Sequence, residues 1–556
     1  MNYDRKKINV YLPFLFAVVL SIGMYIGVKM ANADKKPTSI FTLNLGPKTK
    51  IDQIINFIDK RYVDTVKSEE LIENGIYGLL KNLDPHTSYV PASEFENMNE
   101  PLQGNFEGIG IEFNIINDTI VVISPISGGP SEALGIKPGD RIVYIEKELV
   151  AGTKITTNDV ISKLRGKKGT VVNIKICRKG GTDISAYAIV RDKIPINSVE
   201  IAYMVNDETG YIKLSRFAST THDEFLNGLN KLIGVGLKKL ILDLRGNPGG
   251  YLNAAQDIAD EFLSEKKLIV YTKGKNQPRQ DLTSTNFSSF EKGNLIILID
   301  EGSASASEIV AGAVQDWDRG IIMGRRSFGK GLVQEQTEFT DGSALRLTVA
   351  RYFTPTGRCI QKPYDKGRDA YDLETYERFE KGELTNHDSM PINDTIVYKT
   401  PSGRIVHSGG GIEPDVFIPI DTSGNSQYLN KVFIAGMIHR FAFKYADENR
   451  KSLIEKYQST NTYLKEFGNN DELLNQFATY ADENGVKKEM KQIHKSKELL
   501  KMQLKALVAR QLWGNDGYYP VIHQADAIFQ KAVEYIKDDE LIKNTLSNVS
   551  NTTTNQ

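Results

Sequence analysis

The chain of 556 residues has only two cysteines, Cys177 and Cys359, and they lie far apart. It contains no CxxC pair and no Cys/His cluster with metal-ligand spacing, so we expect no structural zinc and no other metal site. It also has little net charge, because 69 basic and 70 acidic side chains leave −1. Without a basic stripe interleaved with aromatic residues, we expect no nucleic-acid partner.

Two common catalytic motifs are also missing. G-x-S-x-G occurs nowhere, and none of the seven histidines stands in a recognisable triad motif, which disfavours a Ser-His-Asp hydrolase. The segment 324-GRRSFGKG-331 matches the phosphate-binding loop G-x-x-x-x-G-K only in part, because Gly331 stands where that loop needs Ser or Thr to hold magnesium. A strand-like stretch follows instead of the helix that would bind the phosphates. We therefore expect no nucleotide site.

A long apolar run lies near the N-terminus. Residues 8–28 carry no charge and follow the basic 5-RKK-7. As a helix rising about 1.5 Å per residue, this run is roughly 30 Å long, enough to cross a bilayer. The alternative is a secretory signal peptide, for which 31-ANA-33 offers a cleavage site. We favour a signal anchor over residues 1–33 with its N-terminus inside, and both alternatives place the rest outside the cytoplasm, on a periplasmic or extracellular face.

The rest of the chain changes character several times, as expected for two to four domains. Helical periodicity marks an N-terminal region over 34–103, and short alternating strands with Gly/Pro turns mark a β-rich domain over 104–192. From 193 to 425 strands alternate with helices, which implies a largely parallel sheet covered by helices. Residues 426–556 are predicted to be helical before a polar tail, 550-SNTTTNQ-556.

Three serines at alternate positions follow the apolar run 294–300. Ser305 and Glu308 fit the S-x-x-E capping box, in which hydroxyl and carboxylate satisfy the first free N–H groups of a helix. The same place also suits a nucleophile, because α/β folds put their sites at the carboxyl ends of strands. The helix N-terminus offers N–H groups that can stabilise an oxyanion. Pattern alone leaves both interpretations open.

A serine nucleophile needs a base, and Lys330 follows 25 residues after Ser305. A lysine accepts a proton only when neutral, so its pKa of about 10.4 would have to fall by roughly 3 units through burial. If 330–334 runs as a strand, Lys330 and Gln334 point to the same face, and the Gln334 amide could orient the amine. The alternative for a lysine between glycines is an exposed turn.

In combination, the motifs resemble those of the carboxyl-terminal processing (tail-specific) proteases, a family of Ser/Lys peptidases. The resemblance covers residues 50–420 and implies an α/β protease core of the ClpP/crotonase type, with an inserted β-rich PDZ domain and helical N- and C-terminal regions. No metal or organic cofactor is implied. The motifs occur in the order 83-LDPHTSY-89, 108-GIGIEF-113, 138-PGDRI-142, 165-RGKKGT-170, 243-DLRGNPGG-250, 303-SASASEIVAGAVQD-316, 327-SFGKGLVQ-334 and 412-IEPD-415.

The resemblance also implies roles for single residues. Ser305 would be the nucleophile, Lys330 the general base and Gln334 its positioning partner, while Ser303 and Ser307 would be turn and capping residues. Glycines let main-chain N–H groups approach a substrate closely. The implied oxyanion hole consists of the backbone amides of Ala306, Gly249 and Gly250. The implied carboxylate-binding turn of the PDZ domain consists of Gly108, Ile109, Gly110 and Ile111.

These expectations describe an extracytoplasmic serine endopeptidase. Its PDZ domain would hold the C-terminus of a protein with an unstructured tail, added as a strand to a sheet edge, and the dyad would cut near that tail through an acyl-enzyme. The alternative is a non-catalytic, PDZ-based peptide-binding scaffold with an inactive protease fold. The C-terminal helices could bind an adaptor or a second copy of the chain, and residues 8–28 would hold the chain at a membrane.

Overall fold

The computed structural model describes residues 17, 19–21, 23, 24, 49–178, 183–389, 397–468 and 471–547. Most of the predicted anchor, 8–28, and all of the polar tail, 550–556, lie outside the described residues. Among the residues that are described, no helix combines the length and the apolar character needed to span a bilayer. The chain divides into two compact units, Met1–Ile76 and Tyr77–Gln556.

The first unit contains the predicted N-terminal helices. Helix α2 (Lys50–Arg61) begins at a capping box in which Thr49 and Asp52 satisfy each other's backbone N–H groups. Helix α3 (Ser68–Leu80) starts in this unit with Glu69 and Glu70 in its first turn, where negative charge is favourable. Both helices confirm the prediction of a helical N-terminal region from the periodicity of the sequence.

The second unit includes a small antiparallel sheet in the order β3-β4-β5-β7-β8, with β6 beside β5. Along β7 the exposure alternates residue by residue, which is the pattern that predicted these strands. The inward side chains form a core of their own around Ile120, Ile142 and Val172. Strands β2 and β9 pair with each other at the two ends of this segment. The elements are β2 (Asn105–Gly108), β3 (Ile111–Ile116), β4 (Thr119–Pro125), α5 (Pro130–Ala133), β5 (Arg141–Ile145), β6 (Glu148–Leu149), α6 (Thr157–Leu164), β7 (Val171–Cys177), β8 (Ile184–Val190) and β9 (Asp192–Pro195).

The largest core surrounds a six-stranded sheet in the order β10-β11-β12-β15-β16-β21. All neighbours from β11 to β21 run parallel, and only β10 is antiparallel to β11. This confirms the largely parallel sheet predicted from strand-helix alternation. The elements are β10 (Val199–Met204), β11 (Thr209–Leu214), α7 (Thr221–Gly234), β12 (Lys239–Asp243), α8 (Leu252–Asp260), β15 (Asn294–Ile299), α9 (Ala306–Asp316), β16 (Ile321–Gly324) and β21 (Val416–Phe417).

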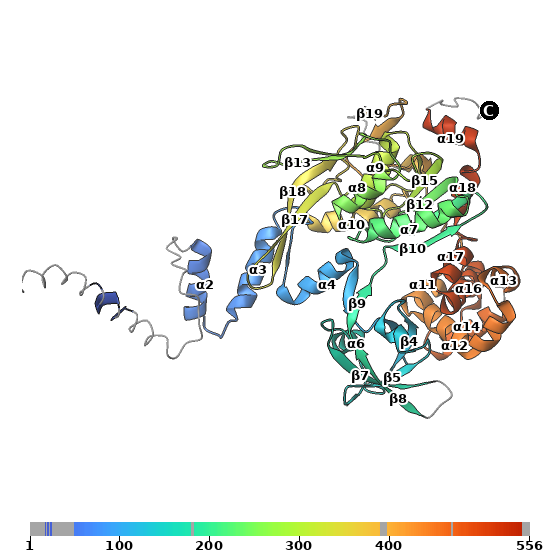
Figure 1. Ribbon diagram of the computed structural model, residues 1–556, viewed down its shortest axis with the longest axis horizontal. Coiled ribbons are helices and arrows are strands. Elements are labelled where there is room, and N and C mark those ends of the chain that lie inside the picture. The colour runs from blue at the N-terminus through green and yellow to red at the C-terminus, as the bar shows by residue number, and fades with distance from the viewer. Residues whose placement is uncertain are drawn as a thin grey trace, which may run out of the picture. The chain divides into compact units, whose positions relative to one another are not determined.

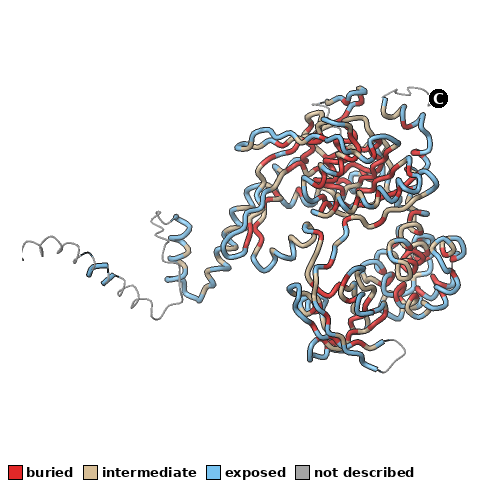
Figure 2. The backbone as a smooth tube through the Cα atoms, viewed as in Figure 1, coloured by how far each residue is buried: buried red, intermediate tan, exposed pale blue. Residues whose placement is uncertain are grey.

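The two faces of this sheet are covered by different parts of the chain. Helices α7, α8 and α9 lie against one face of the sheet (Figure 1). Leu240 and Leu242 of β12 belong to the core on this face. Ile241, between them, points to the other face, which α18 (Ala527–Tyr535) and α19 (Asp539–Leu546) cover. Both faces are therefore buried, which explains why these strands are almost continuously apolar. Figure 2 shows the buried residues concentrated in this core.

A second, antiparallel sheet contains β1, β18, β13 and β14 in that order, with β17 also paired to β18. The charged segment after residue 363 contains the helix α10. The strands of this sheet are β1 (Ser88–Val90), β13 (Leu268–Lys273), β14 (Gln280–Thr283), β17 (Leu332–Glu338) and β18 (Ala344–Phe353). Strands β19 (Val397–Lys399) and β20 (Ile405–His407) form a separate two-stranded sheet with each other, and the remaining helices of this region are α4 (Ala92–Gln103) and α10 (Arg368–Glu380).

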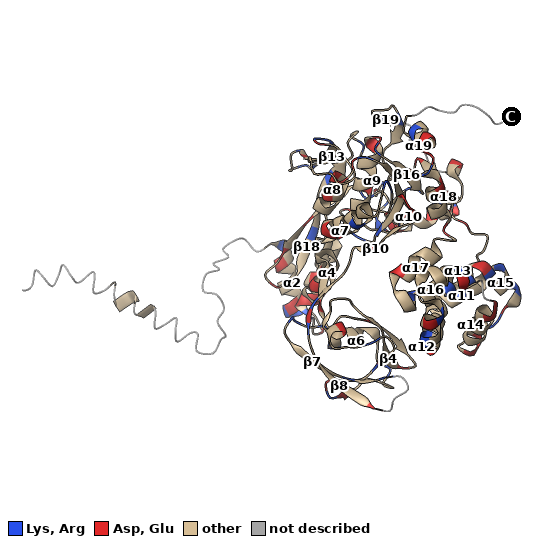
Figure 3. Ribbon diagram, turned by 45° about the vertical axis from the view of Figure 1, so that its right-hand side comes forward, with Lys and Arg blue, Asp and Glu red and all other residues tan. Residues whose placement is uncertain are grey.

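The predicted C-terminal helices have a hydrophobic core of their own, centred on Phe441, Phe477 and Leu504. Acidic and basic residues are interspersed along these and the other elements, in keeping with the near-zero net charge (Figure 3). The helices that contribute are α11 (Gln427–Ile434), α12 (Met437–Tyr457), α13 (Thr460–Glu466), α14 (Asp471–Glu483), α15 (Met490–Lys495), α16 (Lys497–Trp513) and α17 (Asn515–Ile522).

Candidate active site

The three serines lie in the turn between β15 and α9, and the structure separates their roles. Ser303 and Ser307 are fully buried, and their hydroxyls donate to the carbonyl oxygens of Leu244 and Asn247, each at 2.9 Å. Ser305 is only half-buried and lines a cleft of about 940 Å³. Of the three side chains, only that of Ser305 is available to a substrate.

The backbone of Ser305 adopts an unusual conformation. Its φ of 54° and ψ of −112° lie in a region that residues other than glycine rarely occupy. Such strain is held in place by the surrounding structure and occurs preferentially at functional sites. The residue stands immediately before a helix in which every residue is buried, so the turn cannot relax without disturbing the core.

Glu308 connects the Ser305 turn to the segment that carries Lys330. Its carboxylate accepts the Ser305 amide at 2.8 Å, which is half of the predicted capping box, and the Lys330 amide at 2.9 Å. It also accepts the Gly329 amide at 2.7 Å and the Ser327 hydroxyl at 2.5 Å. Burial raises the pKa of Glu308 to about 7, although the four donated hydrogen bonds oppose this rise.

Lys330 lies in the same cleft as Ser305, directly before β17. Burial lowers the pKa of Lys330, the charge of Arg346 lowers it further, and Glu308 opposes the shift. Its ammonium nitrogen lies 3.2 Å from Oε1 of Gln334. Among the described residues there is no hydrogen bond between Ser305 Oγ and Lys330 Nζ.

The orientation of the Gln334 amide is determined by a second contact. Its Nε2 donates to the carbonyl oxygen of His86, in the 83-LDPHTSY-89 segment, so its Oε1 faces Lys330. The His86 ring is fixed in turn by Tyr371 of α10, whose hydroxyl lies 2.8 Å from Nε2. The structure thus brings Lys330 and Gln334 together, and it adds His86 as a neighbour that sequence reasoning had not assigned.

Tyr352 of β18 is another residue that the motifs did not reveal. Its hydroxyl lies 2.6 Å from the carbonyl oxygen of Lys330 and 3.1 Å from that of Ser305. The ring is almost completely buried. A phenol on a neighbouring strand therefore connects the backbones of the two predicted dyad residues.

The three residues predicted for the oxyanion hole also line the cleft. Gly249 has φ 95°, and a Cβ there would lie 2.7 Å from the Ala304 carbonyl oxygen and 2.8 Å from the Ala306 amide nitrogen. The Gly249 N–H donates to Oδ1 of Asn247 at 2.9 Å. In the described part of the chain the amides of Gly250 and Ala306 have no such partner. These two N–H groups are therefore the ones that can face an oxyanion.

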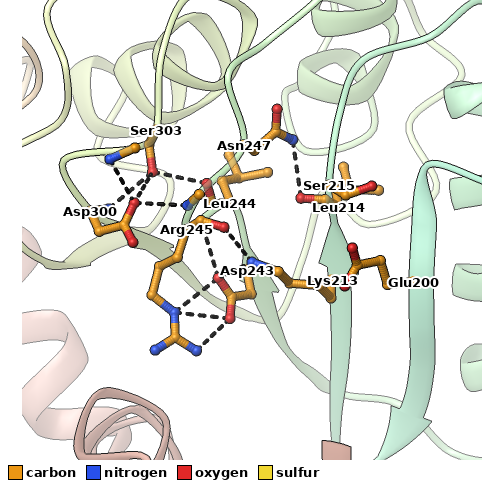
Figure 4. Close-up of polar contacts among 12 residues, drawn as sticks. Glu200, Lys213, Leu214, Ser215, Asp243, Leu244, Arg245, Asn247, Asp300 and Ser303 are labelled. Carbon is orange, nitrogen blue, oxygen red and sulfur yellow. Dashed lines mark hydrogen bonds and ion pairs between the residues drawn. The ribbon is translucent and has the colours of Figure 1, made fainter. Parts of the chain in front are cut away.

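The turn that carries Gly249 is held by buried charges (Figure 4). Burial alone would raise the pKa of Asp243, but Arg245 and Lys213 hold it well below its ordinary value. Arg245 Nε lies 3.0 Å from both carboxylate oxygens of Asp243, and Lys213 Nζ lies 3.2 Å from Oδ1. In the sequence the 243-DLRGNPGG-250 motif was interpreted only through its glycines. Two opposite charges where a buried strand ends, Asp243 and Arg245, were a signal of this ion pair.

The predicted carboxylate-binding turn lies between β2, which ends at Gly108, and β3, which begins at Ile111. Ile109 is buried in the core of the small sheet. Gly110 has φ 71°, and a Cβ there would approach Ile194 Cδ1 to 2.9 Å. In the order of the described strands β3 is an edge strand, so a peptide could pair with it.

Comparison with known proteins agrees with this architecture. Peptidase family S41 matches residues 208–367, a PDZ domain matches 108–185, and a family of unknown function (DUF8443) matches 428–514. The chain is 33% identical over 350 residues to the carboxy-terminal processing protease CtpB of Bacillus subtilis (strain 168). This alignment covers 61% of this chain and 72% of that protein.

Two further similarities are of the same kind. The chain is 38% identical over 319 residues to the carboxy-terminal-processing protease of Bartonella bacilliformis, with 56% of this chain and 72% of that protein covered. Among solved structures, the photosystem II D1 C-terminal processing protease matches 56% of this chain and 89% of its own length, with 27% identity and a TM-score of 0.32. The chain belongs to peptidase family S41, as a carboxy-terminal processing serine protease that carries a PDZ domain.

Proposed function

We propose that this protein is an extracytoplasmic endopeptidase that holds a protein's C-terminus in its PDZ domain and cuts near that tail with Ser305 and Lys330. The observation that carries the proposal is the placement of the two residues. A strained serine at a helix N-terminus and a largely buried lysine line one cleft, and Glu308 accepts the backbone N–H of both.

The first chemical step forms an acyl-enzyme. Neutral Lys330 takes the proton of the Ser305 hydroxyl, and Oγ attacks the carbonyl carbon of the scissile peptide bond. The amides of Ala306 and Gly250 stabilise the oxyanion of the tetrahedral intermediate. When the C–N bond breaks, the Lys330 ammonium returns its proton to the leaving amine. Catalytic contacts are often long without substrate, and in this proposal Nζ approaches Oγ when the substrate binds.

Water completes the cycle at the same site. Lys330 removes a proton from a water molecule, which attacks the ester carbonyl, and the proton then returns to Ser305 Oγ as the ester bond breaks. Gln334 keeps the amine oriented in both steps, because its Oε1 accepts one N–H of the neutral amine and leaves the lone pair free. No metal or organic cofactor is required.

In this proposal the PDZ domain selects the substrate, and the N-terminal segment holds the protein at a membrane. A protein with an unstructured tail would pair with the free edge of β3, and its terminal carboxylate would meet the turn Gly108–Ile111. The apolar run 8–28 supports anchoring in a membrane with the protease on the periplasmic or extracellular side. An adaptor or a second copy bound through the C-terminal helices belongs to the same proposal.

The test uses full-length chain purified in detergent, with unfolded casein as substrate. Ser305→Ala and Lys330→Arg should each lower kcat by roughly 10³-fold or more, because arginine stays charged and cannot act as a base. Lys505→Arg is the matched control, since Lys505 is also mostly buried with a lowered pKa but lies in the C-terminal helices, where it donates to the Leu464 carbonyl.

The pH profile gives a second criterion. Burial lowers the pKa of Lys330. As the pH is raised, kcat should therefore reach half of its maximum at a pH below 10.5, the ordinary pKa of a lysine. Turnover by Lys330→Arg at the wild-type rate would exclude the dyad. Equal inertness of wild type and Ser305→Ala towards casein and towards peptides with apolar C-termini would favour the scaffold alternative.

A further inference from the structure

The N-terminus of helix α18 contacts the turn that leads to the oxyanion glycines. Asp526, the N-cap of α18, accepts the Phe529 amide at 3.0 Å. The same carboxylate pairs with Arg245, with Nη1 3.0 Å from Oδ1 and Nη2 2.7 Å from Oδ2. Residues 515–547 lie beyond both the matched peptidase segment, 208–367, and the matched segment of unknown function, 428–514.

Arg245 is shared between two carboxylates from distant parts of the chain. On one side it binds Asp243, which is 1% exposed at the end of β12. On the other side it binds Asp526, whose side chain is 20% exposed. A guanidinium presents several N–H groups in a rigid plane, so two carboxylates can determine its position. Removal of one of them leaves this cation, and the turn that it belongs to, less well defined.

The position of this turn is transmitted to Ser305 by hydrogen bonds. Two residues after Arg245, the carbonyl oxygen of Asn247 accepts the Ala304 amide and the Ser307 hydroxyl, both at 2.9 Å. The Asn247 side chain accepts the Gly249 amide at 2.9 Å. The residues on both sides of Ser305 are thus bound to the turn that Arg245 anchors.

The helix that carries Asp526 is itself held firmly. Ile528, Phe529 and Ile536 pack into the second face of the sheet. His523, three residues before Asp526, stacks on Phe529 with ring centroids 3.9 Å apart and an interplanar angle of 11°. Its Nδ1 lies 2.7 Å from the Tyr203 hydroxyl. Asp526 therefore occupies a defined position against Arg245.

We infer that Asp526 is a positioning residue for the cleavage reaction, acting through Arg245 on the turn 243–250 and on the residues that flank Ser305. Helix α18 is then needed for efficient cleavage, through the aspartate at its N-cap. This inference rests on the proposed function, because it needs Ser305 to be the nucleophile.

The test compares Asp526→Asn with Asp539→Asn in the full-length chain. Asp539 also joins the C-terminal helices to the sheet, since it lies 2.8 Å from Lys239 Nζ and accepts Asn294 Nδ2 at 2.6 Å, but it does not touch the turn. With a peptide substrate, Asp526→Asn should lower kcat roughly tenfold while KM stays within about twofold. Asp526→Glu should recover part of kcat, and Asp539→Asn should equal wild type.

The outcomes separate this inference from the proposed function. If wild-type cleavage does not depend on Ser305, the proposed function fails. If it does, and Asp526→Asn keeps the wild-type kcat or loses no more than Asp539→Asn, the inference is overturned. If Asp526→Asn does not fold, Asp526→Ser, which keeps a helix-capping oxygen without the charge, decides by the same criteria.

Discussion

At the scale of single residues, Glu308 both caps helix α9 and contacts the two residues of the proposed dyad. A capping glutamate is usually exposed, whereas this one is completely buried among four donors. Two of its partners are the amides of Ser305 and Lys330, which come from separate segments. In its ionised form Glu308 has two acceptor oxygens and no proton to place, so it satisfies all four donors, whereas the neutral amide of a glutamine cannot.

Replacement of Glu308 by glutamine is therefore expected to damage both stability and activity. The side-chain NH₂ of the introduced glutamine would face N–H or O–H donors, and each unsatisfied buried group costs about 1–3 kcal/mol. We expect Glu308→Gln to lower the free energy of unfolding by about that amount and kcat at least tenfold, measured by urea denaturation and peptide cleavage.

Glu301→Gln is the control for this change. Glu301 lies in the turn between β15 and α9 that also carries Ser305, and it pairs with Arg325 without touching Ser305 or Lys330. Its kcat should stay close to wild type. A fully active Glu308→Gln would show that the alignment of the two segments does not depend on this carboxylate.

At the scale of elements, two neighbouring strand-to-helix turns build the site. The turn from β12 to α8 carries Gly249, and the turn from β15 to α9 carries Ser305. They approach so closely that a Cβ on Gly249 would meet the Ser305 Cβ at 2.8 Å. The glycine is needed there for its size as well as for its φ of 95°.

Gly249→Ala should separate these two turns and abolish cleavage, because the clash involves backbone atoms that cannot move away. Gly246→Ala is a matched control in the same turn. It has φ 66°, but a Cβ at this position would have nothing within 4 Å. Both variants should lose about 1–2 kcal/mol of stability from the left-handed backbone, and only Gly249→Ala should lose activity as well. Equal activity of the two variants would contradict the close approach.

The sequence predicted most elements well, since strand alternation and helical periodicity are local properties. Within the strand-helix alternation, apolar periodicity predicts helices over 252–263 and 307–317, which correspond to α8 and α9 within three residues at each end. The segment 363–384 is rich in charged and aromatic residues and interrupts the strand-helix alternation, but its helix α10 is not predicted by the sequence. Its pattern is weakly amphipathic, and its Tyr371 and Arg378 are buried only by tertiary contacts.

At the scale of the whole molecule, the C-terminal helices complete the core. His523 is 3% exposed between the sheet and α18, and burial lowers its pKa to about 4. An unfolded histidine titrates near 6.5, so between these values the unfolded state binds more protons than the folded state. The stabilising contribution of neutral His523 is complete above about pH 6.5 and is lost as the pH falls towards 4.

We expect this residue to make unfolding strongly pH-dependent. The shift corresponds to about 3 kcal/mol. The difference in free energy of unfolding between wild type and His523→Gln should therefore decrease by this amount from pH 7 to pH 4. Urea denaturation at several pH values measures the difference, and comparison with the variant cancels the opposite contribution of Glu308. Parallel profiles for the two proteins would show that His523 does not titrate as proposed.

Local patterns were sufficient to predict most of the elements, their order and the segments that carry the candidate site, because periodicity, turn residues and motif order are properties of neighbouring residues. Three contacts became visible only in the folded chain: the Gly249 amide donates to Asn247, Glu308 accepts the amides of both Ser305 and Lys330, and Asp526 pairs with Arg245. The last two residues are 281 positions apart. Which distant groups meet depends on how the layers pack on the sheet, and no local pattern encodes that geometry.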